Sequence, residues 1–94
     1  MLSAEEAKKW GFVNEVVAHD NLTRRAQELA SQLASGPTKA YGGVKRMLLS
    51  SFSSPIEAQL DNETRHIVGT MDTHDGPHGL HAFLNKEKPR FAGR

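Results

Sequence analysis

The stretch Thr73-His-Asp-Gly-Pro-His-Gly-Leu-His-Ala-Phe-Leu-Asn-Lys-Glu-Lys-Pro-Arg-Phe-Ala-Gly93 organises the C-terminal end of this chain. It opens with turn residues, and its spacing predicts a short helix from about Pro77 to Lys86. Gly76 and Pro77 make a continuous helix through His74 unfavourable, because proline lacks the amide that a helix interior needs. A basic tail follows the predicted helix: Lys86, Lys88, Arg90 and Arg94. Three interpretations of this stretch are open: a metal site, an anion site and a helix end without a ligand.

The metal hypothesis rests on three histidines, His74, His78 and His81, spaced by four and three residues. On one continuous helix they would share a face, where imidazoles can bind zinc, nickel or copper. Asp72 and Asp75 could complete such a site or simply cap the helix. Because of the Gly-Pro break, solvated histidines are the favoured interpretation, and no metal ligand is predicted.

The anion hypothesis rests on Phe83 and Lys86, three residues apart. An aromatic ring beside a cation at this helical spacing suits a nucleotide that carries an adenine ring and a phosphate. The competing interpretation is a solvated tail, which most such charge runs are. Spacing alone leaves both open.

Towards the N-terminus, Ser3-Ala-Glu-Glu6 is a capping box, and the helix that it starts should end at Gly11. Phe12–Val17 has strand composition, but a lone strand cannot close a sheet, so we expect an extended connector. The next helix should be capped by Asp20 or Asn21. Its apolar stripe is Leu22, Ala26, Leu29, Ala30 and Leu33.

Two further helices are predicted in the middle of the chain. Gly36-Pro37 should end one helix and begin the next, with glycine at C′ and proline at N1. Gly42 and Gly43 interrupt that next helix and could permit close helix packing. Ser54-Pro-Ile-Glu57 is a second capping box before the longest helix. The apolar stripe of that longest helix is Ile56, Leu60, Ile67 and Met71.

The bulk composition limits the function classes. Ninety-four residues with 37% apolar side chains form one domain at most, with a modest core or with apolar surface that belongs against a partner. A net charge of +1 is too balanced for an unspecific nucleic-acid binder, and the absence of cysteine excludes a disulfide framework. No stretch approaches the length of a membrane span. The sequence predicts an all-α fold of four to five short helices forming a single helical domain over residues 1–94.

Catalytic signals are weak. The pair Glu5 and Glu6 is explained by a capped first turn, and no nucleophile–base pair or oxyanion hole is evident. The serine-rich run Ser50–Ser54 lacks the flanking glycines of a nucleophile elbow. We therefore predict no catalytic residue in this chain.

Taken together in order and spacing, several segments resemble the C-terminal third of the enoyl-CoA hydratase/isomerase (crotonase) superfamily. The matching segments are Ser3–Ala7, Gly11–Val17, Leu29–Thr38, Ser54–Glu63 and Thr73–Gly93. One departure is His78, which stands where the family has a glutamate before glycine. That departure puts a capping or salt-bridge role at this position in doubt.

The resemblance carries expectations about the whole enzyme. The family's thioester-binding amides and catalytic carboxylates lie in a spiral β/α domain upstream of the segment that matches, so that domain is expected to be a partner. The C-terminal helices help to build a homotrimer or a dimer of trimers, and Phe83 and Lys86 match positions near the adenine and phosphate of CoA. No cofactor is implied beyond coenzyme A as part of the acyl-CoA substrate.

These expectations combine into one hypothesis. The chain is a C-terminal oligomerisation region that completes the CoA pocket of a cytoplasmic enzyme, inactive in isolation, without nucleic-acid or membrane partners. Gly36–Tyr41 and Pro89–Arg94 favour family members that act on ring-containing acyl-CoA in phenylacetate breakdown. The alternative is a free-standing helical module that docks on another protein.

Overall fold

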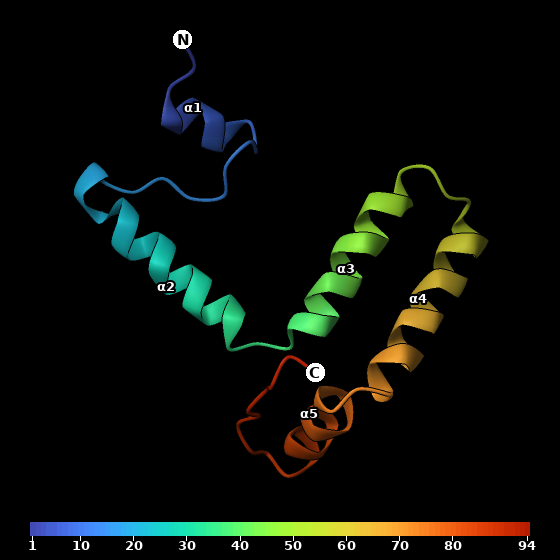
Figure 1. Cartoon of the computed structure of the whole chain (residues 1–94). Coiled ribbons are helices and arrows are strands. Elements are labelled where there is room, and N and C mark those ends of the chain that lie inside the picture. The colour runs from blue at the N-terminus through green and yellow to red at the C-terminus, as the bar shows by residue number, and fades with distance from the viewer. The chain divides into compact units, whose positions relative to one another are not determined.

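The computed structural model describes every residue from Met1 to Arg94 and contains only helices, which confirms the predicted all-α class (Figure 1). Backbone contacts group the chain into two compact units, Met1–Ser31 and Gln32–Arg94. The single helical domain expected over residues 1–94 stays a prediction. The elements are α1 (Ala4–Lys9), the 3-10 helix η1 (His19–Asn21), α2 (Leu22–Ala34), α3 (Thr38–Ser51), α4 (Ile56–Met71) and α5 (Asp75–Leu84).

In the first unit, α1 has both ends that the sequence predicts. Glu6 N–H donates to Ser3 Oγ at 3.2 Å, and Ser3 N–H donates back to the Glu6 carboxylate at 2.9 Å. The bond from the Ser3 backbone, and after it the bond that Ser3 Oγ donates to the same carboxylate at 2.7 Å, hold the pKa of Glu6 below its ordinary value. At the other end Gly11 has φ +76°, and Phe12 N–H donates to Ala7 O at 2.9 Å. This is a Schellman motif with glycine at C′.

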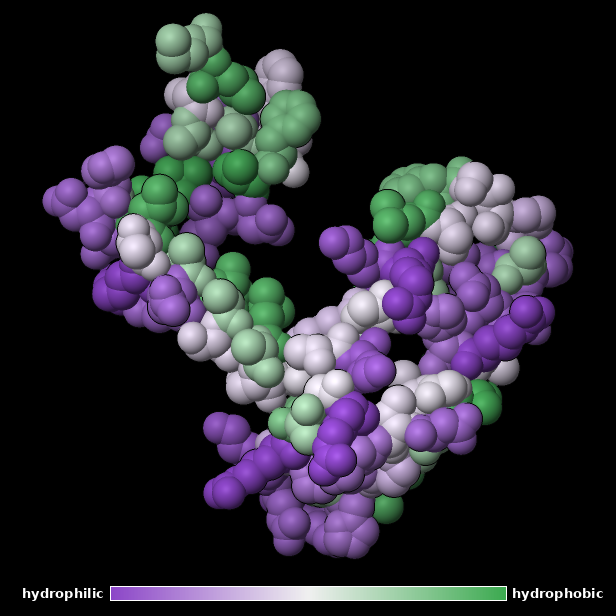
Figure 2. All heavy atoms as spheres, in the orientation of Figure 1, coloured by the Kyte–Doolittle hydropathy of each residue, from purple (hydrophilic) through white to green (hydrophobic).

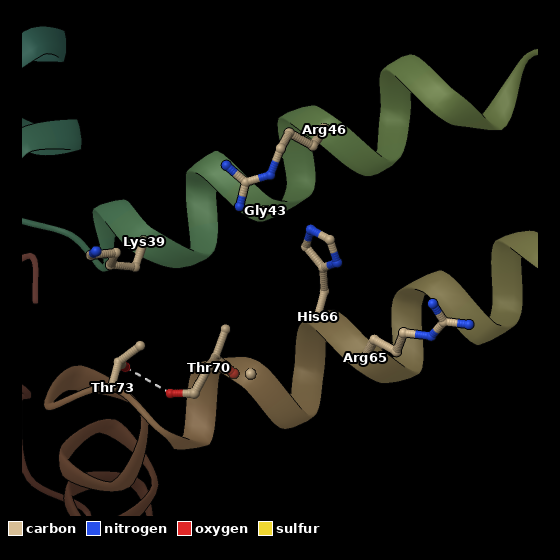
Figure 3. Close-up of a pocket in the computed structure, with 8 residues that line it drawn as sticks. Lys39, Gly43, Arg46, Arg65, His66, Thr70 and Thr73 are labelled. Atoms are coloured by element: carbon tan, nitrogen blue, oxygen red, sulfur yellow. Dashed lines mark hydrogen bonds between the residues drawn. The ribbon is translucent and has the colours of Figure 1, made fainter.

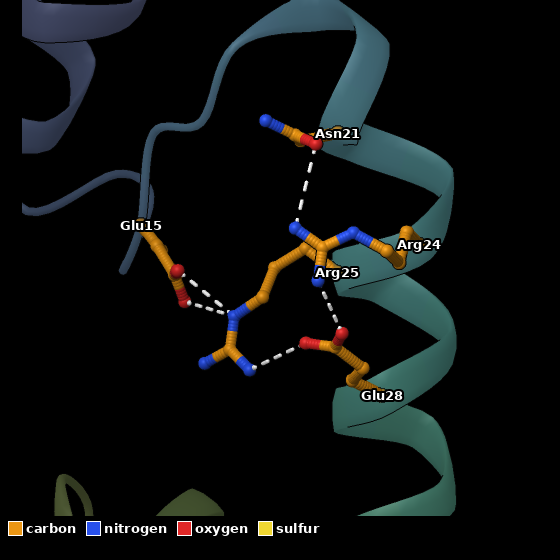
Figure 4. A network of polar contacts seen from close by, with 5 residues as sticks. All are labelled: Glu15, Asn21, Arg24, Arg25 and Glu28. Carbon is orange, nitrogen blue, oxygen red and sulfur yellow. Dashed lines mark hydrogen bonds and ion pairs between the residues drawn. The ribbon is translucent and has the colours of Figure 1, made fainter.

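The connector after α1 forms no strand and is tied to α2 by charge. Arg25 Nε donates to the Glu15 carboxylate at 2.9 Å, and Glu28 pairs with Arg24 at 2.6 Å (Figure 4). The expected cap by a side chain of Asp20 or Asn21 is replaced by the turn of η1, and Asn21 Oδ1 accepts from Arg24 instead. The absence of a strand here agrees with the prediction, whereas the cap prediction is wrong.

In the second unit, α3 and α4 run antiparallel and α5 packs on α4 (Figure 1). Both long helices begin one residue later than predicted. Tyr41 N–H donates to Pro37 O and Gln59 N–H donates to Pro55 O, so each proline is the N-cap rather than N1. The second capping box is therefore wrong, because the residue at N3 of α4 is Ala58 and not a glutamate.

Helix α5 differs from its prediction at both ends. It begins at Asp75, because the first-turn amides of a helix have no intrahelical acceptor and Pro77 is tolerated there. Glycine at position 76 is required sterically, since a Cβ there would collide with the Thr70 carbonyl oxygen at the end of α4. The helix ends at Leu84, so the predicted span to Lys86 is two residues too long.

Candidate functional site

The interface between α3 and α4 is polar, which reverses the usual arrangement of an amphipathic helix pair. Gln59, Asn62 and His66 of α4 are half-buried against α3. Gln59 Nε2 donates to Met47 O at 3.3 Å, and Asn62 Nδ2 donates to Ser50 Oγ at 3.3 Å. The two helices are therefore joined by hydrogen bonds of polar side chains, while the predicted apolar stripe of α4 is exposed.

Gly43 is the closest point of this interface and the one buried residue of α3. A Cβ at this position would lie 3.0 Å from His66 Cδ2, so the missing side chain makes room for the imidazole ring. His66 Nδ1 bonds to Asn62 O at 3.2 Å, while its Nε2 is buried without a partner. The ring points from α4 towards α3 beside a cavity of about 270 Å³ (Figure 3). Close packing at Gly43 is confirmed; Gly42 has no comparable neighbour.

The apolar side chains of this unit lie on its outside. We call the exposed side chains that line one hollow of α3 the outer α3 face: Tyr41, Val44, Lys45, Leu48, Leu49 and Phe52. Phe52 is 94% exposed and Leu49 is 72% exposed. Hydrophobic surface is visible at the end of this helix in Figure 2. On α4, Ile56, Leu60, Ile67 and Val68 are exposed as well. An isolated soluble helix pair rarely presents so much apolar surface, so these faces indicate a docking surface.

Phe83 and Lys86, the predicted CoA contacts, lie at the end of α5. Phe83 belongs to the last turn and is 78% exposed. Lys86 lies beyond the helix with φ +57°, at the C′ position of a second Schellman motif. Its N–H donates to Phe83 O at 3.1 Å, and Glu87 N–H donates to Ala82 O at 2.8 Å. The expectation that Lys86 lies on the last helical turn is therefore wrong; its role in binding stays a prediction.

Asp75 fixes the chain terminus against the start of α5. Its side chain is buried, and its carboxylate accepts from Ala92 N–H at 2.8 Å and from Gly93 N–H at 2.7 Å. Its own N–H donates to Arg94 O at 3.1 Å. The Ala92 bond is the main reason that the pKa of Asp75 lies below its ordinary value; His74 and Gly93 add to the effect and burial opposes it.

The three histidines do not converge on one point. The rings of His74 and His78 stack with centroids 5.9 Å apart, whereas His81 Nδ1 lies 3.1 Å from Asn85 Nδ2. No group of three or more metal-ligating side chains is close enough to hold an ion. His78 Nε2 instead accepts from the backbone N–H of Arg90 at 3.1 Å.

Sequence reasoning missed two of these features. It treated Asp75 as a helix cap or a metal ligand, whereas the carboxylate binds backbone amides 17 and 18 residues away. It also assigned no partner to His78. The only signal was the spacing of three residues between them on one helix, which does not identify a partner in the tail.

Fold and site together define a helical segment with exposed apolar faces and a helix end that carries Phe83 and Lys86. The model of the enoyl-CoA hydratase/isomerase family matches residues 1–94. The chain therefore belongs to the enoyl-CoA hydratase/isomerase family.

Individual relatives agree with this assignment. The chain is 37% identical to the 1,2-epoxyphenylacetyl-CoA isomerase of Escherichia coli K12, over 99% of this chain and 36% of that protein. It is 32% identical to the carnitinyl-CoA dehydratase of Salmonella typhi, over 99% and 37%. The crystal structure of an enoyl-CoA hydratase subunit I from Geobacillus kaustophilus superimposes with a TM-score of 0.91 at 33% identity, covering 98% of this chain and 36% of that one.

The chain thus spans little more than a third of the length of the relatives that it matches, in agreement with the predicted C-terminal helical region of a crotonase fold. None of its helices combines the length and the hydropathy needed to cross a membrane. Its location in the cell stays a prediction.

Proposed function

We propose that this chain is the assembly region of an enoyl-CoA hydratase/isomerase and supplies part of the site that holds the CoA nucleotide. The single observation that carries the proposal is the outward-facing apolar surface of α3 and α4, in a chain that belongs to this family. The reacting carboxylates and thioester-binding amides belong to the upstream domain, so the chain alone is inactive. Its partners are that domain and further copies, in a homotrimer or a dimer of trimers.

The physical basis for assembly is that α3 and α4 meet through polar side chains and expose their apolar ones. Burying Leu48, Leu49 and Phe52 against a partner would each contribute about 1.5–3 kcal/mol, because these side chains are now largely hydrated. The facing sides of α3 and α4 already bond to each other through Gln59 and Asn62. Apolar burial must therefore come from outside the helix pair.

The basis for nucleotide binding is the end of α5. Phe83 offers an exposed ring for an adenine. Lys86 follows it three residues later, and its backbone is fixed by the two hydrogen bonds of the Schellman motif to which it belongs. A lysine ammonium pairs with a phosphate as a point charge. The substrate is an acyl-CoA thioester, and the similarity to the 1,2-epoxyphenylacetyl-CoA isomerase of E. coli supports a ring-containing acyl group.

A chimera tests both parts. The chain replaces the corresponding segment of the E. coli isomerase, and sedimentation and turnover of that enzyme's substrate are measured. The chimera is expected to assemble as the parent does, whereas Leu48→Asp within it should dissociate the assembly. Thr64→Asp, which adds the same charge at an exposed polar position of α4, is the control. Equal assembly of both variants would contradict the docking role.

In the same chimera, Lys86→Gln should raise KM for the acyl-CoA by about tenfold, because a hydrogen bond to a charged group is lost. The matched variant Lys88→Gln removes the same charge two residues away and should leave KM unchanged. The 94-residue chain by itself should show no hydration of a crotonyl-CoA-type substrate. If the 94-residue chain is a stable monomer with turnover of its own, it is an independent enzyme. If it is a stable monomer without turnover, the alternative of a free-standing docking module is supported.

A further inference from the structure

The end of the chain is held on α5 by two side chains that differ in their response to acid. Asp75 accepts the amides of Ala92 and Gly93, and His78 Nε2 accepts the amide of Arg90 at 3.1 Å. The Phe91 ring lies edge-on to His78, with centroids 6.4 Å apart. His78 thus holds the Arg90 amide and contacts the Phe91 ring, whereas Asp75 holds the amides of Ala92 and Gly93.

The His78 contact defines a protonation state. A backbone N–H always donates, so Nε2 must carry a free lone pair, and the ring is neutral with its proton on Nδ1. Adding a proton to Nε2 removes the acceptor and sets two donors against each other. The contact between His78 and Arg90 therefore exists only while this imidazole is uncharged.

We propose that His78 is a protonation-sensitive latch, which holds Arg90 and Phe91 on α5 when it is neutral and releases them when it is charged. An imidazole is the side chain whose charge changes in the physiological pH range. A glutamate at this position would accept the same amide throughout that range, since it stays ionised. The histidine turns a permanent contact into a conditional one.

The surrounding charges favour release in acid. His74 stacks on His78 with ring centroids 5.9 Å apart, and its Nδ1 lies 3.1 Å from the Asp75 carboxylate. The tail contributes the cations Lys88 and Arg90. On the following turn, His81 is engaged with Asn85. The Asp75 carboxylate bonds to His74 and to two backbone amides and makes no ion pair with His78, so a charged His78 gains no partner of its own in the closed state.

Release would uncover a specific hollow. Phe91 lines a cavity of about 200 Å³ together with Ala40 of α3 and Leu80 of α5. It packs over Gly79, where a Cβ would come within 3.1 Å of the ring. Asp75 stays ionised at the pH that charges a histidine, because its carboxylate pKa is lowered. The last residues therefore stay attached while the segment at Phe91 opens.

Amide hydrogen exchange of the 94-residue chain tests the latch, with rates corrected for the intrinsic effect of pH. The Arg90 amide should lose protection by about fivefold between pH 7.5 and 5.0, the factor for one lost backbone hydrogen bond. The midpoint should coincide with the titration of the His78 ring. The Ala92 and Gly93 amides should keep their protection over the same range.

Two variants separate the latch from a general loosening. His78→Gln, whose amide oxygen accepts at every pH, should protect Arg90 equally at both ends of the range. His81→Gln, one turn further along α5, should respond to pH as the unmodified chain does. An Arg90 amide that is unprotected at pH 7.5, or that loses protection in His78→Gln as well, overturns the proposal. Parallel loss at Ala92 and Gly93 also overturns it, because release would then not be selective.

Discussion

Replacing Lys86 by glycine should stabilise the end of α5 although it removes the residue that we propose for phosphate binding. Lys86 has φ +57°, in the left-handed region. A residue with a Cβ loses roughly 1–2 kcal/mol there, a penalty that glycine does not carry. Glycine gives back about 0.4–1 kcal/mol through its freedom in the unfolded chain. The net gain expected for Lys86→Gly is therefore about 0.5–1 kcal/mol.

The assay is hydrogen exchange at the Glu87 amide, which donates to Ala82 O at 2.8 Å and closes the Schellman motif. A gain of about 0.5–1 kcal/mol corresponds to a two- to fivefold rise in protection. Lys86→Ala is the matched control, because it removes the same charge but keeps a Cβ in the left-handed region. Gly11→Ala is the reverse experiment, because Gly11 has φ +76° at the C′ position of the other Schellman motif. The amide of Phe12, which closes that motif, should lose protection in this variant.

The result that refutes this reasoning is equal protection of Glu87 in Lys86→Gly and Lys86→Ala. The left-handed conformation would then carry no strain. Combined with the KM measurement in the chimera, a stabilising Lys86→Gly that weakens acyl-CoA binding would show that the lysine is kept for its ammonium group. Strained residues of this kind are typical of binding sites.

Two further predictions concern packing and acid. Gly43→Ala should destabilise the α3–α4 pair by about 1–3 kcal/mol, because the new methyl group meets His66 at 3.0 Å. The control Gly42→Ala should be neutral or stabilising. In urea unfolding, only Gly43→Ala should lower the midpoint. The pKa of Asp75 is lowered on folding, so its stabilising contribution is complete at neutral pH and is lost as the pH falls below about 4, through the folded pKa. The Ala92 amide signal should follow that loss, and Asp75→Asn should abolish the acid transition; an unchanged transition in the variant would assign it to another group.

Local signals in the sequence predicted the helices well and their interactions poorly. The capping box at Ser3 and the glycine at position 11 act within one turn, so they could be read directly. The prolines at 37 and 55 were placed one residue too far into their helices, because neither N1 nor the N-cap needs a backbone N–H for the helix ladder. The apolar stripe of α4 was recognised, but the sequence could not show whether it faces α3 or solvent.

For the candidate site, Phe83 and Lys86 could be named from spacing and resemblance, but not their geometry. Spacing placed Lys86 on a helical turn, whereas the bond from Glu87 to Ala82 ends the helix earlier and turns its backbone left-handed. The sequence marked His78 as a possible metal ligand and as a departure from a family motif, but not as an acceptor for the tail. Its acceptor role depends on Arg90, which is 12 residues away and reaches it only after the tail folds back.

By itself the sequence determined the helical class, the ends of α1 and the family, because capping, periodicity and motif order are short-range properties of the chain. Only the tertiary structure decided that α3 and α4 meet through Gly43, His66 and amide side chains while their leucines face outward. A stripe of leucines indicates that a helix face is to be buried, but it does not identify the segment that buries it. That choice depends on contacts between distant segments, which no local pattern encodes.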